Sequence, residues 1–170
     1  MFIEVLGSAA GGGFPQWNCN CRNCRAVRAG APGFKPRTQS SLAVSADGVD
    51  WVLLNASPDM RQQIAASPAL QPAPEAGGRA SPIKAVVVTN ADVDHVAGLL
   101  TLRERQPFDI YGSQRVLATL AANAIFDVCA RDVAPRHALR LDERTPLRSA
   151  GRDLGLAVEA FAVPGITALY

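Results

Sequence analysis

The sequence predicts a mixed α/β domain, and three observations support this fold class. The 14 glycines and 12 prolines interrupt the apolar segments throughout, whereas a helical bundle needs long stretches of unbroken helical periodicity. Residues 83–89 form a near-continuous, valine-rich apolar run, which is typical of a strand covered on both faces. A polar loop and a helical pattern of apolar positions over residues 96–105 follow this run, and the order of strand and helix recurs later.

The elements before this central strand are short and separated by turn residues. The pattern predicts, in chain order, a strand over 2–6 ending at Gly7, a helix over 22–28, a β-hairpin of strands 40–45 and 49–55, and a helix over 60–66. The hairpin is the strongest of these predictions because Asp47-Gly48 suits a turn with positive φ. Residues 67–82 hold four prolines and two adjacent glycines, so we expect an exposed loop there.

The elements after the central strand continue the alternation. We expect a strand over residues 108–111, a helix over 113–127, a small strand over 139–141 and a longer strand over 156–163. Gly165 is expected to turn the chain into a return strand that includes residues 168–170.

Length, charge and hydropathy argue against several classes of protein. The 170 residues, 48% of them hydrophobic, suffice for one core, so we expect a single domain over residues 1–170. The net charge of +2 comes from 17 basic and 15 acidic side chains without a basic stripe, which argues against a nucleic-acid partner. No apolar run approaches the roughly 20 residues of a membrane span. The N-terminus lacks the basic region of a secretory signal, so we expect a cytoplasmic location.

Three clustered cysteines, Cys19, Cys21 and Cys24, favour a metal site. Thiolates at this spacing can converge on one tetrahedral Zn²⁺, and a closed site with sulfur ligands would be structural. Free thiols, or a redox pair of Cys21 and Cys24, are the alternatives. Cys129 and His137 are candidates for a fourth ligand, although Cys129 is more typical of a small core residue and His137 of a solvated surface imidazole.

A second candidate site is Asn90-Ala91-Asp92-Val93-Asp94-His95, which follows the central strand. The carboxyl end of a strand is where ligand crevices form in α/β sheets, so these oxygen donors and the imidazole could bind a divalent metal. The alternative is a helix start with Asp92 or Asp94 as its N-cap and His95 packed in the core. The spacing alone leaves both interpretations open.

A family resemblance favours the metal site. Residues 89–98, Thr-Asn-Ala-Asp-Val-Asp-His-Val-Ala-Gly, resemble the metallo-β-lactamase superfamily signature Thr-His-x-His-x-Asp-His-x-x-Gly, with Asn90 and Asp92 in place of two histidines. Together with residues 6–24, 37–41, 55–63 and 161–165, they make the chain similar to the pyrroloquinoline quinone (PQQ) biosynthesis protein B family. The cysteine spacing is shared with related cyclic phosphodiesterases of phosphonate metabolism.

The resemblance implies a metallo-β-lactamase-like αββα sandwich, of which this chain holds only the N-terminal part, and a role in PQQ biosynthesis. It places an active-site metal on Asp94 and His95, with Asp92 as a further ligand or as an orienter of His95. Because Asn90 and Asp92 replace two imidazoles, an Fe²⁺ site suits these residues better than a dinuclear zinc centre. The implied reaction is O₂-dependent hydroxylation of a tyrosine unit from a precursor peptide. Other PQQ-pathway proteins are expected partners.

Two other functions remain open at this point. One is a soluble carrier involved in transport of PQQ or its precursor to the periplasm, and the other is a metal-dependent hydrolase. The family's further metal ligands, including a late histidine for the zinc site, lie beyond the position that matches Tyr170. We therefore expect this chain alone to bind iron poorly.

Several other residues have two interpretations each. The glycine-rich segment 7–13 is expected to let the backbone pass close to the site rather than to hold a phosphate. Asp59 could reach the metal loop, although capping of the following helix is the default. Trp17 could cover the zinc or line a substrate pocket, and Trp51 is expected in the core. We also consider Arg37, Thr38 and Gln39 as contacts for a substrate carboxylate.

Overall fold

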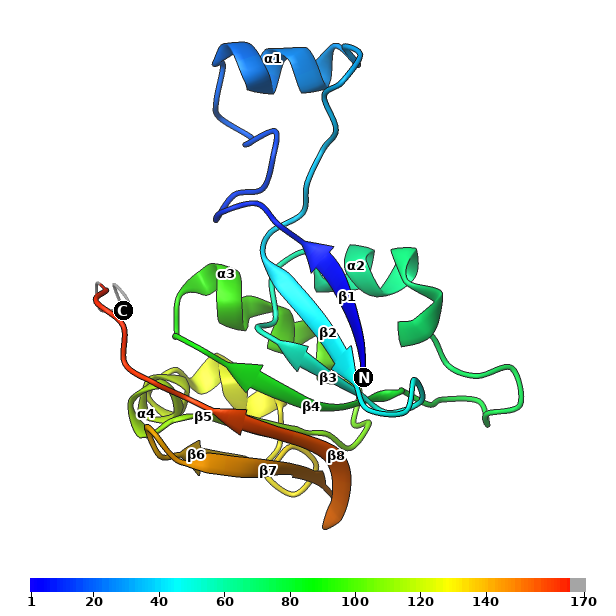
Figure 1. The fold of residues 1–170 in the computed structure, drawn as a ribbon, viewed down its shortest axis with the longest axis vertical. Helices are drawn as coiled ribbons and strands as arrows, with labels where there is room; N and C mark the ends of the chain where they lie inside the picture. The colour runs from blue at the N-terminus through cyan, green and yellow to red at the C-terminus, as the bar shows by residue number, and fades with distance from the viewer. Residues whose placement is uncertain (166–170) are drawn as a thin grey trace.

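Two β-sheets packed face to face, with helices on the outer side of the larger sheet, form the computed structural model, which describes residues 1–165 (Figure 1). The elements in chain order are β1 (Phe2–Gly7), α1 (Arg22–Arg28), β2 (Ser41–Ser45), β3 (Trp51–Leu54), α2 (Met60–Ala66), η1 (Pro68–Leu70), β4 (Ile83–Val88), α3 (Val93–Val96), η2 (Ala97–Leu102), β5 (Asp109–Ser113), α4 (Gln114–Ala122), η3 (Ala124–Val128), β6 (Arg136–Leu139), β7 (Arg144–Ser149) and β8 (Arg152–Glu159). The three η elements are 3₁₀ helices. None of the helices in residues 1–165 has the length and apolar character needed to cross a membrane.

The larger sheet has six strands in the order β1-β2-β3-β4-β5-β6. Strand β2 is antiparallel to both of its neighbours, whereas β3, β4, β5 and β6 are mutually parallel. Strand β1 therefore runs in the same direction as β3 to β6, and the carboxyl ends of all five strands lie along one edge of the sheet (Figure 1). We call this side the carboxyl edge, and the loops that follow β1, β3 and β4 meet there.

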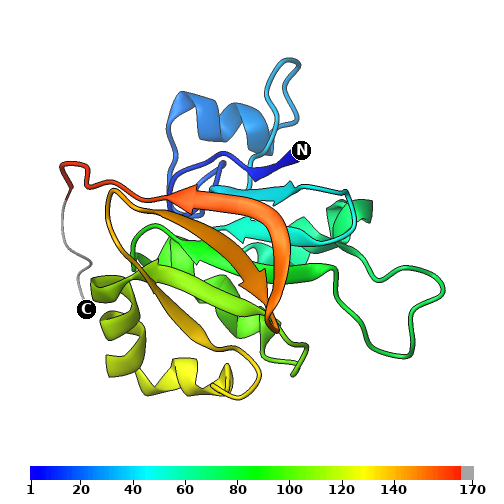
Figure 2. The same cartoon turned by 60° about the horizontal axis from the view of Figure 1, so that its bottom comes forward.

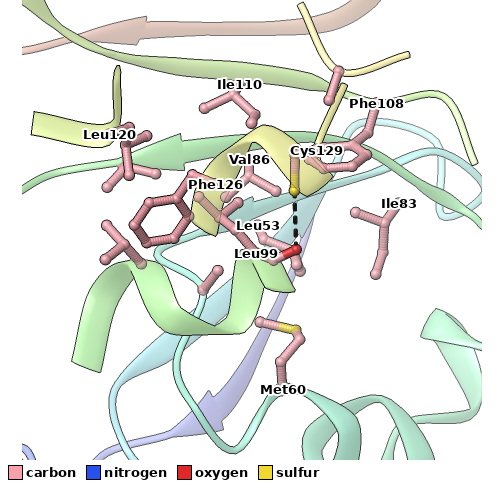
Figure 3. Packing of buried hydrophobic residues seen from close by; sticks show 14 of the residues in the cluster. Leu53, Met60, Ile83, Val86, Leu99, Phe108, Ile110, Leu120, Phe126 and Cys129 are labelled. Carbon is pink, nitrogen blue, oxygen red and sulfur yellow. Dashed lines mark hydrogen bonds between the residues drawn. The ribbon is translucent and has the colours of Figure 1, made fainter. Parts of the chain in front are cut away.

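One face of the six-stranded sheet packs against the helices. Val86 of β4 and Ile110 of β5 face the same side, where they meet Leu99 of η2 and Leu120 of α4, and all four are buried (Figure 3). The Cys129 thiol lies in the same cluster and donates a hydrogen bond to the Leu99 carbonyl at 3.3 Å. Cys129 is thus a core residue, as its sequence context predicted, and Trp51 is buried in the same cluster.

The opposite face of the sheet packs against the β7–β8 hairpin (Figure 2). Val52, Val87 and Tyr111 point toward Leu147 of β7 and Leu154 of β8, and these side chains are buried. The Tyr111 hydroxyl accepts a hydrogen bond from the Arg148 backbone N–H at 2.9 Å and donates one to the Arg148 carbonyl at 2.8 Å. Two backbone groups of the hairpin are thereby attached to the centre of the larger sheet.

The hairpin covers only part of that face. Ile3 and Val5 of β1 lie on the same side of the sheet as Val52, yet they are 60% and 64% exposed. Within residues 1–165, β8 pairs with β7 alone, and the outward side chains of both strands are exposed. The described residues therefore contain one helical layer, one six-stranded sheet and one two-stranded sheet.

Most predicted elements are present, and the differences have physical causes. The β2–β3 hairpin and the central strand β4 are confirmed. The predicted helix over 96–105 is wrong, because α3 begins at Val93 and the chain continues as 3₁₀ helix to Leu102. The predicted helix over 113–127 is divided at Asn123, whose extended backbone ends α4. The exposed loop predicted over 67–82 is also partly wrong, because η1 buries Leu70.

The last strands show the largest displacement from prediction. Strand β6 ends at Leu139, where the prediction began, and β8 starts four residues before the predicted strand. Strand β7 was missed because Pro146 and two arginines interrupt its apolar pattern, as is usual for edge strands. The predicted return strand at 168–170 lies outside the described residues.

The attachment of the hairpin by Tyr111 can be tested by removing one hydroxyl group. Tyr111→Phe keeps the packing and leaves the Arg148 N–H and carbonyl without this partner, so the free energy of unfolding should fall by about 1–3 kcal/mol. Urea denaturation followed by circular dichroism measures the change. Thr119→Val removes a hydroxyl that bonds to the carbonyl of Arg115 in its own helix and should cost less than about 0.5 kcal/mol. Equal effects of the two substitutions would contradict the attachment.

Candidate metal sites

Asp94 and His95 lie side by side at the carboxyl edge, on the short helix α3 that follows β4. The Asp94 Oδ2 and His95 Nε2 atoms are 3.9 Å apart, and the two side chains are 24% and 18% exposed. Zinc bonds to carboxylate oxygen and imidazole nitrogen each measure about 2.0–2.2 Å, so the two atoms can contact one ion. The pair is accessible to solvent, which differs from the alternative in which His95 is a core residue.

Asn90 contacts the His95 ring from the other side. The Asn90 Oδ1 atom lies 2.6 Å from His95 Nδ1 and also accepts a hydrogen bond from the Asp92 backbone N–H at 2.9 Å. Asp92 occupies the N-cap position of α3, but its side chain forms no capping hydrogen bond. The ring contact that we considered for Asp92 is therefore made by Asn90.

Only two of the three residues predicted as iron ligands lie close together. Among residues 1–165, the only group of three or more histidine, cysteine, aspartate or glutamate side chains placed to hold one ion is the cysteine cluster. Asp94 and His95 form a pair, and Asp92 does not join them in such a group. The ligand roles of Asp92, Asp94 and His95 stay predictions.

The glycine-rich segment after β1 passes directly beside this pair. A Cβ atom placed on Gly11 would lie 3.4 Å from Asp94 Oδ2, so the backbone approaches the carboxylate closely. Gly12 has a positive φ of 89°, and its N–H donates to Gln39 Oε1 at 3.0 Å. These contacts agree with the prediction that this segment lets the backbone pass close to the site.

A buried polar network holds the neighbouring loops. The Asp59 Oδ2 atom accepts hydrogen bonds from the Gln39 backbone N–H at 2.8 Å and from Gln39 Nε2 at 3.0 Å. Gln63 Nε2 donates to Thr38 Oγ1 at 3.0 Å and to the Gln39 carbonyl at 2.8 Å. Asp59 thus makes no capping bond to α2, which differs from the default expectation. The side chains of Thr38 and Gln39 are used inside the protein, while Arg37 is exposed.

Two backbone hydrogen bonds fix the segment that carries His95. The Ala56 N–H donates to the His95 carbonyl at 2.8 Å, and the Gly98 N–H donates to the Ala56 carbonyl at 2.9 Å. A Cβ atom on Gly98 would lie 2.2 Å from the Ser57 carbonyl oxygen, so only glycine fits there. This contact gives a structural reason for the glycine that closes the 89–98 motif.

The three cysteines lie on a separate excursion that projects from the sheet together with α1 (Figure 1). Their sulfur atoms all lie within 4.8 Å of one another, and tetrahedral zinc with bonds of about 2.3 Å would hold sulfurs roughly 3.8 Å apart. The three donors therefore fit a zinc ion after a small closure. Arg28 supports the loop by donating to the carbonyls of Cys19 and Gln16.

The thiol at the start of α1 is prepared for ionisation. Cys21 is the N-cap residue of α1, and its Sγ accepts a hydrogen bond from the Cys24 N–H at 3.5 Å. This backbone hydrogen bond, followed by one from the Cys19 thiol, lowers the pKa of Cys21 to about 7. A thiolate is the form that binds metals, so this hydrogen bond prepares Cys21 for metal binding near neutral pH.

The candidates for a fourth zinc ligand lie elsewhere in the fold. Cys129 is buried between η3 and η2, and His137 Nε2 lies 2.6 Å from the buried Asp109 Oδ1. His137 is exposed, as predicted, with 44% of its side chain accessible, and it also stacks on Tyr111 with 4.8 Å between ring centroids. Trp17 is 83% exposed and covers no site in the described structure.

Sequence reasoning missed two groups that shape the carboxyl edge. Asn55 has a positive φ of 64°, and its Oδ1 accepts hydrogen bonds from the Thr89 N–H and hydroxyl at 2.9 and 3.0 Å. Asparagine adopts the left-handed backbone more readily than most residues, so an asparagine at a strand end is a detectable signal for a turn whose side chain holds a neighbouring loop. Gln63 carries no comparable signal, because its buried role depends on partners far away in the sequence.

Comparison with known families identifies the class of this protein. A family model described as "Beta-lactamase superfamily domain" matches residues 50–169, which is more than half of the chain. The chain therefore belongs to the β-lactamase superfamily. The α/β fold predicted from the sequence is confirmed, together with the metallo-β-lactamase fold that the resemblance implied.

Within that superfamily, the chain is a homologue of coenzyme PQQ synthesis protein B. It is 54% identical to the protein of this name from Methylorubrum populi over 100% of its length, and 56% identical to that from Methylobacterium sp. strain 4-46 over 98%. These matches cover 54% and 53% of the relatives. The chain thus spans about half the length of the curated relatives it matches, in agreement with a partial sandwich.

Solved structures show the same relationship. The crystal structure of Zn²⁺-bound PqqB from Methylobacterium extorquens is 53% identical, with a TM-score of 0.90 over 98% of this chain and 54% of that one. A diphosphatase from the PhnP family shares the fold, with a TM-score of 0.66 at 24% identity over 85% of this chain and 52% of that one. The first of these relatives was crystallised with bound Zn²⁺, which agrees with the metal binding that the sequence predicts for this chain.

The close packing at Gly98 leads to a prediction about stability. In Gly98→Ala the new methyl group would overlap the Ser57 carbonyl, so the free energy of unfolding should fall by about 1–3 kcal/mol or more. Denaturant unfolding measures this loss. Gly77→Ala is the matched control, because a Cβ atom there meets nothing within 4 Å and the change should be nearly neutral. A Gly98→Ala variant as stable as the control would show that the contact does not constrain the loop.

The cysteine cluster leads to a prediction about metal content. The purified chain should hold about one zinc ion, and Cys24→Ser should lose it because two sulfurs cannot replace a three-sulfur site. Cys129→Ser should keep the zinc, since Cys129 lies in the core away from the cluster. Mass spectrometric metal analysis of the three proteins decides the question. Loss of zinc in both variants, or in neither, would overturn this assignment.

Proposed function

We propose that this chain acts in PQQ biosynthesis as part of an iron- and O₂-dependent hydroxylase whose substrate is a tyrosine unit derived from a precursor peptide. The observation that carries the proposal is the pair of Asp94 Oδ2 and His95 Nε2, 3.9 Å apart at the carboxyl edge. Homology to coenzyme PQQ synthesis protein B supports the pathway. The substrate class, and other proteins of the pathway as partners, rest on that homology.

The donor set favours a redox metal over a pair of hydrolytic zinc ions. One carboxylate and one imidazole match two of the three ligands in the two-histidine, one-carboxylate set of iron oxygenases. A dinuclear centre needs an imidazole ligand at this position, and Asn90 has none. Its amide oxygen already contacts the His95 ring and the Asp92 backbone N–H. The same replacement disfavours the hydrolase function.

Each residue of the edge has a definite part in this proposal. Bound Fe²⁺ would supply the activation of O₂ next to the phenol ring. Asp94 and His95 would hold that ion, with Asp92 as a further candidate ligand, and the bare backbone of Gly11 leaves room beside the carboxylate. The three cysteines would hold a separate structural Zn²⁺ on the α1 excursion. We treat residues 1–170 as one domain that is incomplete relative to its relatives.

The test is metal analysis after anaerobic Fe²⁺ reconstitution, with zinc counted separately. The chain should bind iron weakly, because it offers two firm ligands where three are usual. Asp94→Ala and His95→Ala should each lower the bound iron at least tenfold while zinc stays constant. Asp132→Ala removes an exposed carboxylate paired with Arg105 and is the matched control. If the amount of bound iron is unchanged in both variants, the assignment of the site is refuted.

Activity is measured on a tyrosine-containing peptide in the presence of O₂ and a two-electron reductant such as ascorbate, because one oxygen atom enters the product and the other is reduced to water. A product that carries one added oxygen atom should form only with iron and with both Asp94 and His95. The same assay should be run after joining this chain to the part of the Methylorubrum populi relative that it does not match. Binding of PQQ that is unchanged by both substitutions, without hydroxylation in either protein, would instead support a carrier.

A further inference from the structure

Asn90 occupies a position where the superfamily signature has a histidine, and its contacts show a different use. Its Oδ1 atom lies 2.6 Å from His95 Nδ1 and 2.9 Å from the Asp92 backbone nitrogen. Both contacts have hydrogen-bond length, and both converge on the same side-chain atom. Asn90 thus joins the start of α3 to the ring that α3 carries.

The backbone contact determines the orientation of the amide, and the amide determines the state of the ring. The Asp92 N–H can only donate, so the atom of Asn90 that faces it must be the carbonyl oxygen. A carbonyl oxygen cannot donate, so the proton in the second contact belongs to His95 Nδ1. In the neutral ring the lone pair then lies on Nε2, the atom that is 3.9 Å from Asp94 Oδ2.

The neighbouring Asp94 side chain does not oppose this arrangement. The Asp94 carboxylate is too far from Nε2 for a hydrogen bond, so it does not hold a proton there. Asn90 itself follows Thr89, whose backbone N–H is held by Asn55 Oδ1 at 2.9 Å. The end of β4 is therefore fixed before the chain reaches the amide that orients the ring.

We propose that Asn90 is a positioning residue that keeps His95 in its Nδ1–H tautomer and turns Nε2 toward an ion shared with Asp94. The inference rests on the proposed function only in taking His95 as a metal ligand. Asn90, which stands where the signature has a histidine, thus orients the ligand His95 and does not bind the metal itself. Hydrogen bonds of this kind fix the tautomer and orientation of metal-binding histidines, and their loss typically lowers metal affinity about 10–100-fold.

The tautomer can be measured without any metal. The chain has two histidines, His95 and His137, so ¹⁵N spectra of histidine-labelled protein contain few signals, and His137→Gln assigns them. In mildly alkaline buffer, where imidazoles are neutral, His95 should show a protonated Nδ1 and an unprotonated Nε2. Asn90→Leu should shift the ring toward the opposite tautomer, and Asn90→Asp, which keeps an acceptor oxygen, should restore the original state. A protonated Nε2 in the unaltered chain would overturn the proposal.

The second readout is zinc binding followed at the His95 ring nitrogens, which separates this site from the cysteines. Asn90→Leu should weaken binding of Zn²⁺ at this site about 10–100-fold, and Asn90→Asp should recover most of the loss. Unchanged affinity and tautomer in a folded Asn90→Leu variant would refute the positioning role. If the tautomer behaves as expected but Zn²⁺ never reaches Nε2, the positioning by Asn90 stands and the ligand role of His95 fails.

Discussion

The carboxyl edge depends on one backbone contact, the packing of Gly98 against residues 56 and 57. Hydrogen bonds from Ala56 to the His95 carbonyl and from Gly98 to the Ala56 carbonyl join the segment after β3 to the segment after β4. A side chain at position 98 would separate the two segments, because its first carbon would overlap the Ser57 carbonyl. The position of the His95 ring relative to the sheet therefore follows from the absence of a single methyl group. Asp94, one residue earlier, lies against the glycine-rich segment, where a Cβ atom on Gly11 would be 3.4 Å from its Oδ2.

The two candidate metal sites are built by different physical means. The cysteine cluster is local, since three residues within six positions converge at the start of α1 and Arg28 holds their loop through backbone carbonyls. The edge site is assembled from segments that are far apart in sequence, including Gly11, Asn90 and Asp94. It exists only when β1, β3 and β4 are aligned, and the bonds of Asp59 and Gln63 keep the intervening loops in place. A local site suits structural zinc, whereas an edge formed by several loops leaves solvent access for a substrate.

What the sequence could predict was set by the range of the interactions involved. The β2–β3 hairpin, the central strand and the cysteine cluster depend on neighbours in the chain, and all three are present as predicted. The change from α3 to 3₁₀ helix occurs where Gly98 meets residue 57, a contact that no local pattern encodes. Asp94 and His95 were recognisable through the family resemblance of residues 89–98, because their spacing alone left two interpretations open. The hydrogen bond between His95 and Asn90 depends on a turn held by the Asp92 N–H and could not be predicted. The exposure of His137 was predicted, but its contacts were not, because Asp109 and Tyr111 lie on the neighbouring strand β5.

Part of the larger sheet's apolar face is left uncovered by the β7–β8 hairpin. Ile3 and Val5 continue the apolar face that the β7–β8 hairpin buries over β3 to β5, and β8 has one unpaired edge on that side within residues 1–165. Exposing such side chains costs about 25 cal/mol for each Å² of apolar surface, so a second sheet that extended over β1 would stabilise the domain. The relatives have about twice the length of this chain, which is enough for such an extension. Strands that continue the sheet of the β7–β8 hairpin over Ile3 and Val5 would thus complete the apolar core on this face.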